Sequence, residues 1–459
     1  MKRMNRVKRF LPAALAAVLA LSAGCGSNAN KGSNGVEQIY VGYYEGAFLD
    51  SHWKSWEALY NAAHPNEKVE LILEGDPAYG MALENTLMTG VTPDIITSPM
   101  TWRLFASKGW LEPLGDVYRS EFNSSMTMEE ALNDEIADNL LFKNEYYAIP
   151  FSEYMTGIAV NKGFFDEHGW DIPKTMTDML DIVDKINALP ENHDADGGND
   201  VYPFVWSGVN AQYYWNYIMN TWWANYGGIS EISTFKQMES PEVYYTEARI
   251  KAVDALLTLI GGKGTPKNCA PGVIGLNLTD SQMMFAAGQA VMLPNASWLE
   301  TEIASNMPEG FEMVLIAPPS IEGSKESDNL YGHVDEWLII PAAAQNKDAA
   351  KKFVSFIFSE EGLLDFFRTT NTTSAFKVDY SKAVSDDMTE WSRSVLALRS
   401  EKHIFYSEGS SPFIYSGLAS FWQTKMVTQM VTEGQTAEQI VRYDYEQVQK
   451  DWSSWQKQI

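Results

Sequence analysis

Apolar residues in this chain recur in two periods, one of about two residues and one of three to four, and the two alternate along the sequence. Short apolar runs that end in polar or turn-forming residues predict buried strands, with helical segments between them. The first three lie at residues 38–42, 69–73 and 94–97. This alternation predicts an α/β fold with a mostly parallel sheet. Ligands lie beyond the carboxyl ends of such strands, so we expect Glu45, Asp76 and Ser98 along one rim.

The helical period is clearest in two segments after the middle of the chain. Apolar residues between 176 and 186 share one helical face, and Thr175 with Asp178 predicts the cap that precedes them. Residues 350–357 are apolar at the spacing i, i+3, i+4, i+7. Two further helices are predicted near the C-terminus, at about residues 416–431 and from residue 436.

A polar patch separates two apolar runs in the middle of the chain. Within residues 146–160, Ser152, Glu153 and Tyr154 lie between these runs. The pattern favours two strands joined where the backbone passes from one domain to another, although a single strand with an irregular middle fits it as well. Residues 333–340 repeat the design, with polar residues running into an apolar strand, and we interpret them as a second crossing.

The first 24 residues have the charge and hydropathy pattern of a lipoprotein signal peptide. Five basic residues and no acidic residue precede the apolar residues 11–21, and small residues then lead to Cys25. Cys25 would carry the lipid, and residues 25–36, rich in Gly, Ser and Asn, would form a flexible tether. We expect a protein anchored by lipid on the outer face of the cell membrane. An ordinary cleavage site that happens to precede a cysteine is the alternative.

The mature chain is strongly acidic. The sequence holds 34 Lys and Arg and 60 Asp and Glu, and removal of the signal peptide leaves 29 basic residues, a net charge of −31. A surface this acidic disfavours nucleic acid and anionic lipid headgroups as partners. With Cys25 lipidated, Cys269 is left without a disulfide partner. The mature length exceeds what one hydrophobic core usually supports, which predicts two domains.

Five motifs follow one another along the mature chain. They are residues 93–96 with 109–114, residues 147–161 with Phe165, Pro173 with Thr175 and the helix behind them, residues 285–292 with Trp298, and residues 348–353. In this order and spacing they resemble the extracellular solute-binding proteins of ABC importers, the large family that includes the maltose- and multiple-sugar-binding proteins. The resemblance covers nearly the whole mature chain.

The resemblance implies a two-lobed, periplasmic-binding-protein-like α/β fold, with hinge strands between lobes that close on a ligand. The N-terminal lobe would hold residues 37–150 and 337–390, and the C-terminal lobe residues 151–336 and 391–459. It also implies a monomer that is not an enzyme and has no cofactor. Such a protein captures a mono- or oligosaccharide and delivers it to the permease subunits of an importer.

A sugar ring presents an apolar face and a belt of hydroxyls, so its site needs aromatic rings and carboxylates. By the resemblance, Trp298 and Trp422 match the rings that stack on sugars, whereas residues 97–99 replace an aromatic of the maltose-binding pattern. The residues predicted to contact ligand are Glu45, Asp76, Ser98, Ser152, Glu153, Tyr154, Trp206, Trp215, Trp298, Asp335, Trp337 and Trp422.

Two other functions stay open at this point. A peptide or polyamine could replace the sugar on the same fold, and two acids across a sugar-lined cleft are also the arrangement of a secreted carbohydrate-active enzyme. No metal site is predicted, because residues 193–200 resemble a calcium loop but lack the glutamate at its twelfth position. Phosphate loops and nucleophile elbows are missing from the sequence as well.

Overall fold

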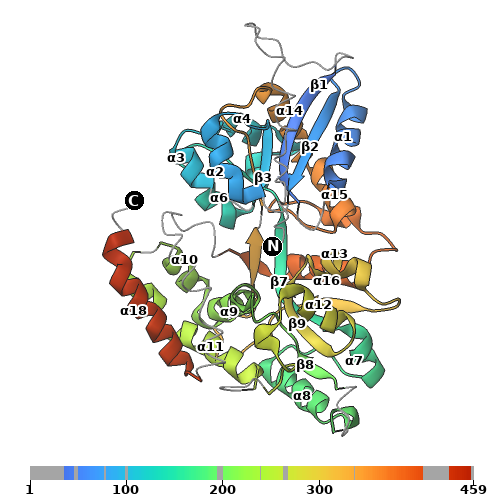
Figure 1. Ribbon diagram of the computed structural model, residues 1–459, viewed down its shortest axis with the longest axis vertical. Coiled ribbons are helices and arrows are strands. Elements are labelled where there is room, and N and C mark those ends of the chain that lie inside the picture. The colour runs from blue at the N-terminus through green and yellow to red at the C-terminus, as the bar shows by residue number, and fades with distance from the viewer. Residues whose placement is uncertain are drawn as a thin grey trace, which may run out of the picture.

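The computed structural model shows two lobes, one above the other in Figure 1, and each is built around a β-sheet flanked by helices. The predicted α/β class is confirmed. The structure describes residues 36–45, 50–76, 79–98, 102–193, 200–237, 239–261, 267–334, 336–406 and 434–455. Cys25, Asp335, Trp422, most of the calcium-like loop and the helix predicted at residues 416–431 lie outside these ranges.

The upper sheet has five strands in the order β2-β1-β3-β12-β6. Their bounds are β1 Glu37–Tyr44, β2 Val69–Asp76, β3 Ile95–Ser98, β6 Ile149–Pro150 and β12 Trp337–Ile339. The first three are parallel to one another, and β12 is antiparallel to both β3 and β6. The sheet therefore combines the start of the chain with a strand from its last third.

The lower sheet is centred on β7, whose nine residues are all buried. Its strand order is β13-β11-β7-β9-β8, and β10 pairs with another part of β7. The bounds are β7 Glu153–Asn161, β8 Tyr202–Phe204, β9 Ala290–Ala296, β10 Met313–Ile316, β11 Asn329–Val334 and β13 His403–Phe405. A separate hairpin pairs β4 Glu121–Asn123 with β5 Met126–Thr127.

Helices cover both sheets, and their amphipathic faces follow the sequence pattern. Those of the upper lobe are α1 Ser51–Ala63, α2 Tyr79–Thr89, α3 Trp102–Ser107, α4 Gly115–Tyr118, α5 Met128–Ala131, α6 Asp134–Leu140, α14 Lys347–Ile357 and α15 Glu360–Thr370. Those of the lower lobe are α7 Lys162–His168, α8 Met176–Asn187, α9 Ala211–Gly227, α10 Ile229–Gln237, α11 Glu247–Leu259, α12 Leu278–Ala286, α13 Leu299–Ile303, α16 Glu390–Glu401 and α18 Ala437–Trp455. In the described part of the chain, none of these helices combines the length and the apolar character needed to span a bilayer.

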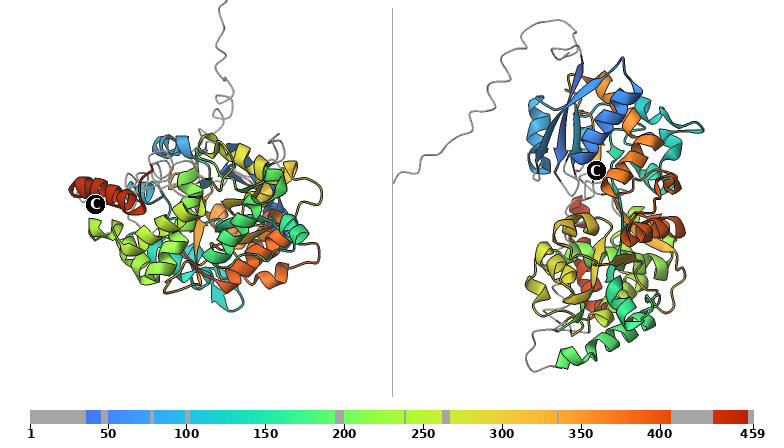
Figure 2. Two further views of the ribbon diagram at one scale, coloured as in Figure 1. Left: turned by 90° about the horizontal axis from the view of Figure 1, so that it is seen from below. Right: turned by 90° about the vertical axis from the view of Figure 1, so that its right-hand side faces the viewer.

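The predicted helix signals are confirmed at α8 and α14. Thr175 and Asp178 form a reciprocal capping box, and the apolar face of α8 is buried. The apolar positions of residues 350–357 are buried along α14. The last helix, α18, runs along the outside of the lower lobe (Figure 1 and Figure 2, left) and is tied to α11 by a buried ion pair, Arg249 to Asp444 at 2.6 Å.

Three connections link the sheets within the described residues. The first leaves β6 at Pro150 and enters β7 at Glu153, so residues 146–160 form two strands in two sheets, and the single-strand alternative is wrong. The second leaves β11 and enters β12, which confirms the second crossing. The third follows α15 and passes Thr373. The Phe151 N–H donates to the Glu336 carbonyl at 2.8 Å, so the first two connections are hydrogen-bonded to each other.

Aromatic side chains in the upper lobe surround His52 of α1. Its ring lies 5.3 Å from that of Trp56, 5.6 Å from that of Phe151 and 5.6 Å from that of Phe366. Burial lowers the pKa of His52 to about 3, against a smaller opposing effect of Asp50. The unfolded chain therefore binds a proton between about pH 6.5 and pH 3 that the folded chain does not bind. The free energy of unfolding should fall as the pH is lowered through this window.

We expect His52→Phe to remove part of the acid sensitivity of the fold. In the parent protein this histidine alone should reduce the free energy of unfolding by about 2 kcal/mol between pH 7 and pH 5. Urea unfolding at both pH values measures the difference, with His168→Phe in α7 as the control. Equal losses in His52→Phe and in the parent protein would contradict this account.

Candidate functional site

The carboxyl ends of β1, β2 and β3 form one edge of the upper sheet. Tyr44 pairs with Asp76 across β1 and β2, and the Glu45 N–H donates to the Asp76 carbonyl at 3.2 Å. Ser98 ends β3 at the same edge. The prediction that Glu45, Asp76 and Ser98 share a rim is confirmed. Asp76 is exposed and Glu45 half-buried, whereas Ser98 is buried.

A pair of tryptophans lies beside this rim. Trp337, the first residue of β12, pairs with Ser98 of β3 and is half-buried. Its ring lies 6.0 Å from that of Trp102, which begins α3 four residues after Ser98. The upper edge therefore has an aromatic neighbour near the place where the sequence departs from the maltose-binding pattern. Trp102 was not among the residues predicted from the sequence. Its position only four residues after Ser98 could have indicated that it lies near this edge.

The lower lobe carries an aromatic cluster next to the two crossings, which consists of Tyr154, Tyr214, Tyr217, Trp298 and His333. Trp298 is half-buried, and its ring lies 4.8 Å from Tyr154, 6.3 Å from Tyr214, 6.2 Å from Tyr217 and 6.1 Å from His333. Tyr154 and His333 are paired across β7 and β11. The cluster thus lies where these strands approach the upper lobe.

The helical period of α9 decides which of its aromatic residues join the cluster. Tyr214 and Tyr217 are three positions apart, so they lie on one face of the helix, and both contact Trp298. Trp215 lies about 100° around the helix and packs 6.2 Å from Trp206 in the core. The sequence prediction took Trp215 from this run and missed the two tyrosines. Helical spacing was the signal that could have found them.

Trp206 and Trp215 are fully buried in the lower lobe. Trp206 is 1% exposed and donates its indole N–H to Cys269 Sγ at 3.2 Å, and Trp215 is 0% exposed. Burial raises the pKa of the Cys269 thiol to about 12, which leaves it protonated. Both tryptophans therefore act as core residues in this conformation. The ligand contacts predicted for them remain untested, and their burial does not favour such contacts.

Glu153 is the centre of a buried ion-pair network. Arg399 Nε of α16 donates to Glu153 Oε2 at 2.8 Å, and the Tyr406 hydroxyl donates to Oε1. Arg399 also donates to the carbonyl oxygens of Ser374 at 3.1 Å and Phe376 at 2.8 Å, in the third connection. Protein groups thus donate to both carboxylate oxygens of Glu153. The ligand contact predicted for Glu153 remains untested, and this geometry does not support it.

The charges of this network stabilise one another. Burial alone would lower the pKa of Arg399, but the Glu153 carboxylate and the nearby tyrosines raise it above the ordinary value. Burial and the same carboxylate raise the pKa of Tyr406. A charged Arg399 and a neutral Tyr406 are therefore the stable forms. Beside the network, the Ser152 hydroxyl is buried and has no hydrogen-bond partner among the described residues.

Within the described ranges, no three His, Cys, Asp or Glu side chains come together in a group that could hold a metal ion. The candidate site consists of rings from the lower lobe and of carboxylates with the half-buried Trp337 from the upper lobe, whereas Trp102 is 2% exposed and packs behind Trp337. Of the predicted ligand contacts, the structure brings Tyr154 and Trp298 together and gathers Glu45, Asp76, Ser98 and Trp337 at the opposite edge.

The chain is similar in sequence to known solute-binding proteins. The profile of the bacterial extracellular solute-binding protein family matches residues 46–363. The multiple sugar-binding protein of Streptococcus mutans is 23% identical over 318 residues, which cover 68% of this chain and 69% of that protein. The diacetylchitobiose binding protein NgcE of Streptomyces coelicolor is 21% identical over 262 residues, and the matched region spans about half of each chain, 56% of this one and 52% of the relative.

Solved structures share the two-lobed fold. A chitin oligosaccharide binding protein superposes with a TM-score of 0.66 at 16% identity, covering 90% of this chain and 98% of that one. The solute-binding protein RafE, solved in complex with raffinose, gives a TM-score of 0.63 at 18% identity, covering 90% of this chain and 99% of that one. At these identities the likeness is one of fold.

We expect the Glu153–Arg399 pair to be required for stability. Glu153→Gln or Arg399→Met alone should lower the free energy of unfolding by about 3–5 kcal/mol, because each leaves a buried partner uncompensated. The double variant should be more stable than either single variant, since it buries no lone charge. Chemical denaturation measures all three.

The exposed Glu438–Arg442 pair of α18 provides the matched control, and Arg442→Met should change stability little. A Glu153→Gln protein that unfolds at the same denaturant concentration as the parent would show that the network does not stabilise the fold.

Proposed function

This chain belongs to the bacterial extracellular solute-binding protein family, and from that premise we propose that it captures a mono- or oligosaccharide between its lobes for an ABC importer. The observation that carries the proposal is the half-buried Trp298 ring at the centre of the aromatic cluster. The half-buried rings of Trp298 and His333 suit the apolar face of a pyranose, and the buried tyrosines of the cluster support them from the core.

The upper edge supplies the polar half of the proposed site. Asp76 is exposed and Glu45 is half-buried at the strand ends, and carboxylates accept strong hydrogen bonds from sugar hydroxyls. Trp337 adds a half-buried ring at the same edge. Closure of the lobes would bring this edge to the aromatic cluster, so that one sugar meets rings on one side and carboxylates on the other.

Lobe closure needs two bodies, and we propose that they divide as the sequence predicts, into residues 37–150 with 337–390 and residues 151–336 with 391–459. The contacts of the late helices support this division. Trp56 of α1 donates to the Gly362 carbonyl of α15 at 2.8 Å, which holds α15 on the upper lobe. Ser394 of α16 accepts from the Leu315 N–H of β10 at 2.9 Å, which holds α16 on the lower lobe.

Binding without catalysis is the expected activity. The family is one of binding proteins, and the relatives named above bind sugars by their names. We further propose that the chain is a monomer, tethered to the outer face of the cell membrane by a lipid on Cys25, which would keep it near the permease. The signal-peptide pattern that ends at Cys25 supports this anchor.

We expect a sugar panel to raise the thermal unfolding temperature of the mature protein, because a ligand that binds only the folded state stabilises it. With the best sugar, Trp298→Ala should weaken binding by about tenfold or more in calorimetry, since a stacked ring contributes on the order of 1.5 kcal/mol beyond the area it buries. Trp170→Ala, a half-buried tryptophan of the lower lobe outside the aromatic cluster, is the matched control.

Three results would change this proposal. Product formation from the bound sugar would make the protein an enzyme. Saturable binding of a peptide or polyamine, with no response to any sugar, would keep the fold and replace the ligand. Equal sugar affinity in Trp298→Ala and Trp170→Ala would move the site away from the aromatic cluster.

Cys25→Ala should abolish the lipid anchor. We expect the parent protein to enter the detergent phase in Triton X-114 partitioning and to incorporate labelled palmitate, and the variant to do neither. Palmitate incorporation that persists in the variant would place the lipid on another residue.

A further inference from the structure

A pocket of about 670 Å³ opens on the upper lobe, away from the crossings. It lies between the end of α1, the β4–β5 hairpin, the end of α14 and the start of α15. The first residue of α1 follows the rim at β1, and the pocket is at the other end of this 13-residue helix. At 1.5 Å per residue, about 20 Å separate the two. The pocket is therefore distinct from the proposed sugar site.

Three rings form an aromatic corner in this pocket. The rings of Tyr60 and His64 are stacked, with 4.3 Å between their centres and planes 28° apart. Phe356 stands almost perpendicular to both, 5.3 Å from each, at 88° to Tyr60 and 79° to His64. His64 Nδ1 lies 3.1 Å from the Tyr60 carbonyl oxygen, which can only accept. In the neutral ring Nδ1 therefore carries the proton, and Nε2 is a hydrogen-bond acceptor.

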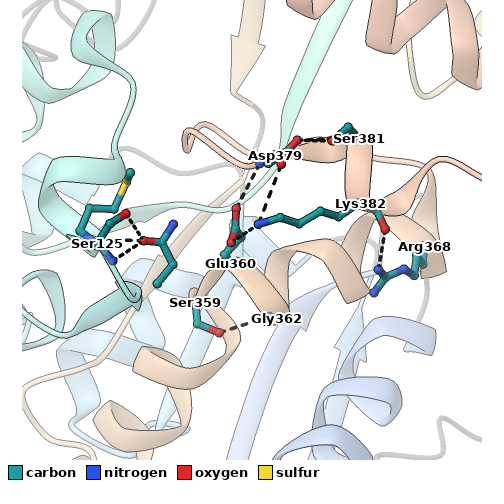
Figure 3. Close-up of polar contacts among 10 residues, drawn as sticks. Ser125, Ser359, Glu360, Gly362, Arg368, Asp379, Ser381 and Lys382 are labelled. Carbon is teal, nitrogen blue, oxygen red and sulfur yellow. Dashed lines mark hydrogen bonds and ion pairs between the residues drawn. The ribbon is translucent and has the colours of Figure 1, made fainter.

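Carboxylates outnumber cations around the corner. Four glutamates line the pocket against one lysine, Lys352. The glutamates are Glu67, Glu121, Glu360 and Glu361. Lys352 lies 3.5 Å from Glu67, and Lys382 from outside the lining lies 2.7 Å from Glu360, as Figure 3 shows. For Glu121 and Glu361, both exposed, the described residues contain no ion-pair partner.

Glu360 and Glu361 are held at the pocket edge by the start of α15. The Ser359 hydroxyl caps the helix by accepting from the Gly362 N–H at 3.2 Å, and the Asp379 N–H donates to Glu360 at 3.4 Å (Figure 3). The cap fixes the first turn, in which both glutamates lie. The cap thus fixes the backbone from which Glu360 and Glu361 project.

We propose that this pocket binds an organic cation, one with ammonium or guanidinium N–H donors on a short apolar chain. The half-buried Phe356 ring attracts a cation through its negative face, and the buried Tyr60 ring supports the corner from behind. The Glu121 and Glu361 carboxylates and His64 Nε2 accept hydrogen bonds from its N–H groups. The net negative charge of the pocket repels an anion and does not attract a neutral ligand. The inference does not rest on the sugar site.

Agmatine, which has both groups on a four-carbon chain, is the probe. Calorimetry on the full mature chain should show saturable binding that weakens between 50 and 500 mM NaCl, because salt screens exposed charges. The double variant Glu121→Gln/Glu361→Gln should weaken binding by about tenfold. Phe356→Ala should weaken it too, whereas the exposed Glu401→Gln of α16 should not.

Trp298→Ala separates the pocket from the sugar site. Agmatine affinity should be unchanged in this variant, and sugar affinity should be unchanged in the double glutamine variant. No saturable binding of agmatine would overturn the proposal, as would equal affinity in the double variant and in Glu401→Gln. Loss of agmatine binding in Trp298→Ala would assign the cation to the space between the lobes. Thermal unfolding of each variant confirms that it is folded.

Discussion

The buried carboxylate of Glu153 is the constraint on which the relation between the lobes depends. It is 0% exposed at the first residue of β7, where the chain has just left the upper sheet. Taking an ion pair out of water is costly, and only good geometry with every donor and acceptor satisfied offsets that cost. Arg399 contributes to this geometry by donating from Nε to Glu153 and from Nη2 to two carbonyl oxygens of the third connection.

The backbone around Glu153 extends this constraint to all three connections. The Glu153 N–H donates to the Thr373 carbonyl at 2.9 Å, and the Phe151 N–H donates to the second connection at 2.8 Å. These hydrogen bonds join the second and the third connection to the first. One further ion pair spans the lobes, since Lys236 of α10 lies 2.9 Å from Glu135 of α6. Such a pair favours one lobe arrangement over others.

The layout of the fold could be read from the sequence because it follows from local rules. Alternating strands and helices set the parallel edge, and that edge places Glu45, Asp76 and Ser98 together. The partners of Glu153 could not be read in this way. Arg399 is 246 positions away and Tyr406 is 253, and no spacing rule connects them. A polar residue in a crossing suggests a ligand contact until its long-range partner is known.

For the aromatic residues, too, local patterns could be read from the sequence, whereas their packing partners could not. As aromatic residues, both Trp215 and Tyr217 are expected to be buried. Their positions around α9 decide that Trp215 faces the core and Tyr217 faces the aromatic cluster. A similar distinction separates the two sites that we propose for this chain. In an acidic protein, rings with carboxylates nearby occur in several places, so chemistry depends on what the carboxylates already contact. Glu153 is paired and holds structure, whereas Glu361, which lines the pocket with Phe356, has no ion-pair partner among the described residues and belongs to the proposed cation site.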